Sequence, residues 1–238
     1  MIVNYTKEGW EIITQRCHGL LAGQICAEWK ISERPERWIE TLIATTEHDD
    51  VFNEFNISPL LTSTGGPIDF AMTKFDQNAC SRMIDMALTK SRFIALLFAR
   101  HIAFTHGEEP MAKKYLARLK KLEKQWLKDA QISVGDVDYA YSLLEFCDAF
   151  SLLICQHLIP PEKRNLEIGQ GPHGRSYEFF QHQDGRLIVS PWPFEVSRFE
   201  IAYERITLAS LTYKSEDDFR KAIREAKIIR QNIIISKN

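Results

Sequence analysis

The sequence lacks long hydrophobic runs, paired cysteines and an excess of either charge. Its 238 residues include five cysteines, an odd number, and none stands in a Cys-x-x-Cys pair, so no disulfide framework is indicated. No apolar run approaches the roughly 20 residues that a membrane-spanning helix needs. The first residues lack the basic and apolar regions of a secretory signal. We therefore expect a soluble, cytoplasmic protein with reduced thiols and no membrane partner.

The formal net charge is only −2, which provides no general attraction for nucleic acid. The basic residues crowded into 110–131 have a simple interpretation as the solvated face of a helix, so the composition argues against a nucleic-acid partner. With 45% hydrophobic residues the chain can bury a substantial core. One compact unit is expected, and a homo-oligomer is left open.

The first two thirds of the chain have the apolar spacing of helices, with intervals of three and four residues. This spacing predicts helices over 9–30, from 33 towards Asp50, and over 76–106, 110–131 and 136–158. The stretch "NISPLLTSTGGPIDF" interrupts the pattern with two prolines and adjacent glycines, which indicates an ordered loop.

Composition changes at Pro160 and Pro161, where glycine, aromatic and β-branched residues become frequent. Asp184 and Gly185 lie between two strand-like runs, a hairpin signal of the type I′ kind. Alternation over 199–203 suggests another strand, and Ser215 can cap a closing helix over 216–230. The sequence thus predicts a mainly α fold: a helical core over 1–160, and over 161–238 a small antiparallel β subdomain with a closing helix packed on that core.

Four of the predicted helices place an ionisable residue on an apolar stripe. Residues three, four and seven positions apart share a helix face, and by this test His18, Asp49, His101 and Asp148 point towards the core. Each has an ordinary explanation when taken singly, because a core histidine can bond a carbonyl and an inward aspartate can pair with a basic residue. A single divalent cation bound by imidazole and carboxylate groups would satisfy all of them together. We therefore expect a metal pocket for one or two ions of Mn, Fe, Zn, Ni or Mg.

His48 and Asp49 form a doublet at the end of the second predicted helix. Neighbours on a helix point about 100° apart, so both can reach one ion only near a helix end. The order His18, His48-Asp49, Asp148 resembles the pattern of the HD-domain metal-dependent phosphohydrolases. That resemblance implies an HD-like helical bundle with these four residues as metal ligands, and His101, with His106 as the second choice, as an additional one. It also implies hydrolysis of a phosphate ester or phosphoanhydride by metal-activated water.

Several segments resemble more closely an uncharacterised bacterial family known only as a domain of unknown function. They are "QRCHGLLAGQICAEW", "EHDDVF", "GGPIDF", "ARHIAF" and "SPWPF", and the resemblance runs from about residue 2 to residue 230. It implies shared site residues but names no reaction.

Three acids beside these segments are candidates for catalysis. Asp50 and Glu47 flank the doublet and could orient a metal-bound water, although a solvated helix end is the simpler explanation of both. Asp69 lies on the glycine-bearing loop that follows and could fold over the pocket. We expect a small-molecule substrate, possibly phosphorylated. Two alternatives stay open: a di-iron oxygenase on the same kind of scaffold, and a non-catalytic protein that binds a metal or a ligand.

Overall fold

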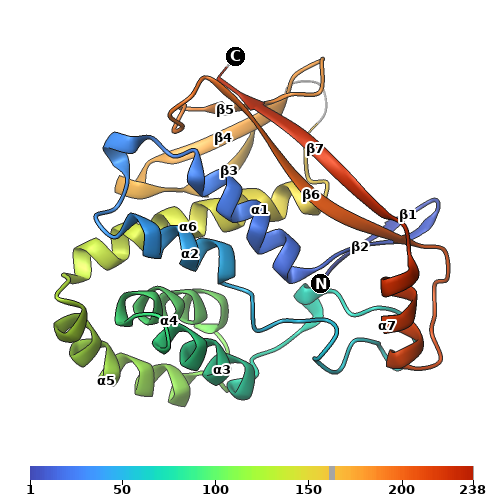
Figure 1. Ribbon diagram of the computed structural model, residues 1–238, viewed down its shortest axis with the longest axis horizontal. Coiled ribbons are helices and arrows are strands. Elements are labelled where there is room, and N and C mark those ends of the chain that lie inside the picture. The colour runs from blue at the N-terminus through green and yellow to red at the C-terminus, as the bar shows by residue number, and fades with distance from the viewer. Residues whose placement is uncertain (161–163, 238) are drawn as a thin grey trace.

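The computed structural model describes residues 1–160 and 164–237, and both helices and strands are prominent in it (Figure 1). The described helices of more than one turn are α1 (Gln15–Ala27), α2 (Trp38–Glu47), α3 (Gln77–Leu88), α4 (Arg92–His106), α5 (Lys113–Ala130), α6 (Val134–Cys155) and α7 (Glu216–Glu225). The described strands are β1 (Ile2–Thr6), β2 (Gly9–Ile13), β3 (Leu166–Gln170), β4 (Ser176–Gln181), β5 (Leu187–Ser190), β6 (Arg198–Leu208) and β7 (Ile228–Ser236).

The strands form one mixed sheet in the order β1-β2-β6-β7-β5-β4-β3. Neighbours are antiparallel except β5 and β7, which run parallel, and the sheet curls into a half-barrel. With 47% helix and 21% strand, the expected HD-like bundle with a small β subdomain is wrong, and the protein is not all-α. Helices α1 and α6 pack against this sheet, while α3, α4 and α5 lie on the side away from it (Figure 1).

The N-terminal hairpin is the main element that the apolar spacing did not indicate. Residues 9–13 were expected in a helix but form β2, which pairs with β1 on one side and with β6 on the other. Helix α1 begins only at Gln15, because the side chain of Thr14 accepts a hydrogen bond from the backbone of Cys17 at 3.2 Å and caps the helix. Strands from both sides of residue 160 therefore share one sheet, and the division of the chain at that point stays a prediction.

Glu11 fastens the hairpin to the rest of the sheet. Its carboxylate is almost fully buried and accepts hydrogen bonds from Arg205 at 2.7 Å, from Asn4 at 3.1 Å and from His157. Burial raises the pKa of Glu11, but hydrogen bonds from His157 and Asn4 and the charges of His157 and Arg205 outweigh burial and lower the pKa below its usual value. The ionised carboxylate therefore stabilises the junction of β2 and β6.

Three other expectations are confirmed only in part. The helix expected over 76–106 is interrupted after Leu88, because Ser91 caps a new helix by accepting from the backbone of Ile94 at 3.1 Å. The hairpin at Asp184-Gly185 is present between β4 and β5, but the expected type I′ turn is wrong: the loop is longer, and Gly185 has a φ of 90° while Asp184 has no positive φ. The closing helix ends at Glu225, and β7 follows it.

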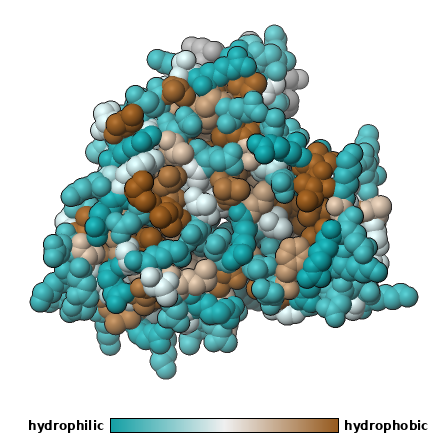
Figure 2. Space-filling model, viewed as in Figure 1, coloured by the Kyte–Doolittle hydropathy of each residue, from teal (hydrophilic) through white to brown (hydrophobic). Residues whose placement is uncertain are grey.

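Two large hydrophobic clusters make up most of the core. One joins α1 and α6 to the sheet, and the other joins α3, α4 and α5, while residues of α2 and α6 contribute to both. The outer face seen in Figure 2 is mostly hydrophilic, with separate small hydrophobic patches. None of the described helices has the length and hydropathy required to cross a membrane. The predicted metal ligands lie where α1, α2, α4 and α6 meet.

Candidate metal centre

Close packing of α1 against α2 brings the first histidine to the doublet. A Cβ on Gly19 would lie 2.6 Å from the carbonyl oxygen of Thr46, and one on Gly23 would lie 2.2 Å from the Thr46 hydroxyl. Larger residues at these two positions would force the helices apart. The small residues therefore allow the rings of His18 and His48 to lie with their centroids 5.2 Å apart, edge to face.

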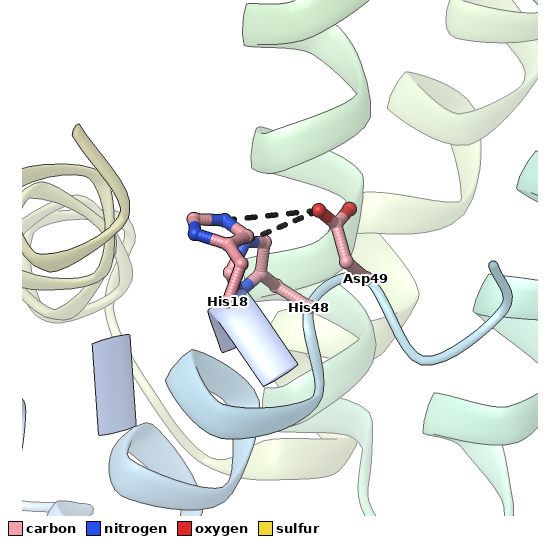
Figure 3. Close-up of side chains that lie close together, drawn as sticks. All are labelled: His18, His48 and Asp49. Carbon is pink, nitrogen blue, oxygen red and sulfur yellow. Dashed lines mark ion pairs between the residues drawn. The ribbon is translucent and has the colours of Figure 1, made fainter. Parts of the chain in front are cut away.

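The doublet lies where α2 ends. Helix α2 stops at Glu47, His48 is its C-terminal cap, and Asp49 belongs to the turn that follows. This end lets the two neighbours converge: the Oδ2 atom of Asp49 lies 3.6 Å from His48 Nε2 and 3.9 Å from His18 Nε2. Figure 3 shows the carboxylate of Asp49 facing both imidazole rings.

Helices α4 and α6 complete the cluster with His101 and Asp148. The Oδ1 atom of Asp148 lies 2.9 Å from His18 Nε2 and 3.2 Å from His48 Nε2. The ring of His101 lies 5.0 Å from that of His48, centroid to centroid. All five side chains that the sequence predicted as ligands are buried, and they fall into two overlapping groups whose ligand atoms lie within 4.8 Å of one another.

Hydrogen bonds orient two of the imidazoles so that Nε2 faces the cluster. His48 Nδ1 lies 2.8 Å from the carbonyl oxygen of Thr45, an acceptor, so Nδ1 carries the proton in a neutral ring. His18 Nδ1 lies 2.8 Å from Ser151 Oγ, which itself donates to the carbonyl of Asp148 at 2.9 Å and must therefore accept from His18. Both Nε2 atoms are thus left with a lone pair, the form that binds a metal.

Three nitrogen atoms of the cluster have no hydrogen-bond partner among the described residues. They are the Nε2 atoms of His18 and His48 and the Nδ1 atom of His101, and all three are buried. The two Nε2 atoms lie near the Asp148 carboxylate without hydrogen-bond geometry. A buried lone pair close to a carboxylate oxygen is unfavourable unless a cation or a proton lies between them.

The distances within the cluster fit a transition-metal ion. Ligand atoms bound at about 2.0 to 2.2 Å from one ion can lie at most about 4.4 Å apart. The Nε2 atoms of His18 and His48 lie 2.9 to 3.9 Å from the carboxylate oxygens of Asp49 and Asp148, within that limit. Imidazole with carboxylate is a donor set that suits manganese, iron, zinc or nickel.

The charges inside the cluster interact strongly. Burial lowers the pKa of His48, but the carboxylates of Asp49 and Asp148 outweigh burial and raise the pKa to about 10. Burial raises the pKa of Asp148, but the adjacent imidazoles of His48 and His18 keep it well below its usual value. Burial lowers the pKa of His101. The pocket therefore favours ionised carboxylates together with positive charge, which a bound cation supplies.

Three residues around the ligands were not indicated by the sequence. Gln15 donates to Asp49 Oδ2 at 2.8 Å, while Ser151 and the carbonyl of Thr45 fix the two histidines. Ser151 had a signal that could have found it, because it lies three residues after Asp148 on the same face of α6. Gln15 had no such signal in the sequence, because its position relative to Asp49 depends on where α1 begins.

The three predicted catalytic acids form ion pairs or hydrogen bonds with residues outside the ligand cluster. Glu47 pairs with Lys90 at 2.8 Å, and Asp50 lies 3.7 Å from Arg16, with burial raising the Asp50 pKa. Asp69 accepts from the backbone of Val3 at 2.9 Å and from the backbone of Ala71 at 2.8 Å. The structure brings none of these acids into the described ligand groups, so their catalytic roles stay predictions.

A cavity of about 430 Å³ opens beside the cluster. Asp49, His101 and Asp148 line it, while His18 and His48 lie behind them. The loop that was predicted to fold over the pocket contributes Pro59, Leu60 and Ile68 to the cavity wall. A small molecule could therefore reach the ligand cluster from one side.

Comparison with known proteins identifies the family. A family model described as "Protein of unknown function (DUF3891)" matches residues 1–210, which is most of the chain. The chain belongs to the DUF3891 family. This DUF3891 protein matches no curated protein and no solved structure. The resemblance to a family of unknown function is thus confirmed, whereas the comparisons give the resemblance to HD-domain enzymes no support.

Proposed function

We propose that this DUF3891 protein is a metal-dependent hydrolase in which one divalent cation activates a water molecule. The observation that carries the proposal is the set of buried, unpartnered imidazole nitrogens of His18, His48 and His101 facing the carboxylates of Asp49 and Asp148. These five residues would hold the ion. A bound cation lowers the pKa of its water towards neutrality and supplies a nucleophile.

One ion fits the ligand set better than two. Both ligand groups contain His48, whose Nδ1 is occupied by the carbonyl of Thr45 and whose Nε2 alone is free. A single nitrogen atom binds a single ion. Asp148 also lies 2.9 Å from His18, which joins the two groups. The di-iron oxygenase, which needs two ions, is therefore the less supported alternative.

The cavity favours a catalytic over a purely structural ion. A structural site is closed by protein ligands, whereas a catalytic site keeps a position for water or substrate. Here Asp49, His101 and Asp148 face a cavity large enough for a small molecule. The sequence resemblance suggested phosphate esters or phosphoanhydrides, and the order His18, His48-Asp49, Asp148 is the support for that class.

Metal reconstitution with an activity assay tests the proposal. Protein stripped with a chelator would be reloaded separately with Mn²⁺, Zn²⁺, Fe²⁺ or Ni²⁺ and assayed on p-nitrophenyl phosphate, p-nitrophenyl butyrate and p-nitrophenyl hexanoate. We expect hydrolysis with at least one metal, its loss in the chelator-treated protein, and its loss in Asp148→Asn. Stoichiometric metal without hydrolysis of any ester, together with oxygen consumption by the Fe²⁺ form, would favour the oxygenase instead.

A further inference from the structure

The cavity beside the cluster is lined mainly by apolar side chains. They come from the loop after the doublet and from α4 and α6, and include Phe52, Ile57, Ile68, Phe70, Ile102 and Leu152. At about 30 Å³ for each water molecule, the cavity has the volume of about fourteen waters, which suits a small organic molecule.

No lysine or arginine side chain is among the described residues that line this cavity. The charged groups at its edge are already paired: His106 Nδ1 lies 2.7 Å from Glu109, and the amino group of Met1 lies 3.3 Å from the buried carboxylate of Glu54. The described residues that line this cavity therefore offer a bound anion no unpaired cationic side chain.

The charge of the occupied site follows from its ligands. One divalent cation with the carboxylates of Asp49 and Asp148 and neutral imidazoles gives a net charge of zero. A phosphate dianion would add two negative charges that nothing in the apolar wall offsets, and an uncompensated buried charge is costly. A neutral group bound through its carbonyl oxygen would leave the site neutral.

We propose, on the basis of the proposed function, that the substrate is an uncharged carboxylic ester or amide with an apolar body that fills this cavity. A water that the bound ion activates would add to the carbonyl carbon, so that a carbon-oxygen bond to water would form and the bond to the leaving oxygen or nitrogen would break. The proton from that water ends on the leaving group. The carboxylic acid product ionises, and its charge favours release from the apolar cavity.

Calorimetric titration with matched ligands tests the charge and the apolar body. Hexanamide and hexyl phosphate share one tail but differ in the charge of the head group, and butanamide shortens the tail by two methylenes. We expect the metal-loaded protein to bind hexanamide about tenfold or more tightly than hexyl phosphate. Butanamide should bind about 15-fold more weakly than hexanamide, from ~0.8 kcal/mol for each methylene. Tighter binding of hexyl phosphate, or equal binding of the two amides, would overturn the proposal.

Variants of Ala71 provide a test within the chain. Ala71 lines the cavity and is exposed, so a longer side chain can be accommodated. Ala71→Lys adds a cation at the mouth and should shift the preference towards hexyl phosphate, whereas the uncharged Ala71→Met should not. The same preference of both variants for hexanamide would contradict the role of charge.

Failure of the proposed function can be separated from failure of this inference. If the protein takes up no metal, the hydrolase proposal fails, and the same titrations on the metal-free protein still decide whether the cavity selects uncharged apolar ligands. If metal binds and p-nitrophenyl phosphate is hydrolysed in preference to p-nitrophenyl hexanoate, the hydrolase proposal survives and the inference fails.

Discussion

Replacing Ser151 by alanine should weaken metal binding without disturbing the fold. Ser151 is fully buried on α6, where its hydroxyl donates to the carbonyl of Asp148 and accepts from His18 Nδ1. Its oxygen therefore keeps the proton of His18 on Nδ1 and the lone pair on Nε2. The alanine variant loses this control of the tautomer while all five proposed ligands remain in place.

The Ser151→Ala variant should lose metal affinity but little of the stability of the metal-free protein. Removing an orienting partner of a histidine ligand typically lowers metal affinity by about 10- to 100-fold, which is about 1.4 to 2.7 kcal/mol. In the metal-free protein the proton of His18 can move to Nε2, where the negative charge of Asp148, with Oδ1 at 2.9 Å, stabilises it. The unsatisfied Nδ1 donor, which would otherwise cost about 1 to 3 kcal/mol, is then avoided.

Competition with a chromophoric chelator measures the affinity, and thermal unfolding of the metal-free protein measures stability. Ser142→Ala is a matched control, because Ser142 also lies on α6 and donates to the carbonyl three residues earlier, Tyr139, at 2.8 Å. The control should keep the wild-type metal affinity. Unchanged affinity in Ser151→Ala would refute the assigned tautomer of His18.

Three further predictions concern stability. Gly19→Ala should lower the melting temperature and the metal affinity, because overpacking against Thr46 costs about 1 to 3 kcal/mol whereas the better helix propensity of alanine offsets only about 1 kcal/mol. Gly135→Ala is the control, because a Cβ at this position meets only a side-chain oxygen at 3.7 Å. This control should be neutral or stabilising in the same thermal unfolding experiments. Asp69→Ala should lower the free energy of unfolding, measured in denaturant, by about 0.5 to 2 kcal/mol, as the loss of a helix cap does, and should keep wild-type metal affinity. A weaker metal affinity would indicate that Asp69 belongs to the metal site. Glu11, with its lowered pKa, contributes stability that is complete above the unfolded pKa near 4.5 and is lost as the pH falls through the lower folded value. Glu11→Gln should therefore be less stable than wild type at pH 7, and the difference should shrink below pH 4.5; a difference independent of pH would contradict this.

Helices were predictable where one apolar stripe continues, whereas strands β1 and β2 were not. The apolar spacing over 136–158 indicated α6 within a few residues at each end. Strands β1 and β2 have five residues each, and β2 pairs with β1 on one side and with β6, almost 200 residues later, on the other. The pairing with β6 leaves no local periodicity, so the residues of β2 resembled the start of α1.

At the C-terminal end of the chain, by contrast, a local signal for a strand was present, but the signal for a helix after Ser215 outweighed it. Isoleucines at 228 and 229 and at 233–235 are typical of a strand, yet the helix begun at Ser215 was extended through the first two. The parallel pairing of β5 with β7 then depends on tertiary contacts, which composition does not show.

The proposed ligands could be selected from sequence because burial and charge conflict. His18, His101 and Asp148 each stand on a helix face that is otherwise apolar, and that conflict is visible without a structure. The cavity could not be predicted in the same way, since its walls come from a loop whose path depends on contacts such as the one between Asp69 and Val3.

Metal stoichiometry tests the central claim most directly. Protein stripped of metal would be reloaded with Mn²⁺, Zn²⁺, Fe²⁺ or Ni²⁺, desalted and measured by elemental analysis, beside a variant that combines His48→Ala with Asp49→Ala. We expect about one ion for each wild-type chain with at least one of these metals, and none in the variant, which should remain folded by circular dichroism. No bound ion in the wild type, or equal uptake by the variant, would contradict it.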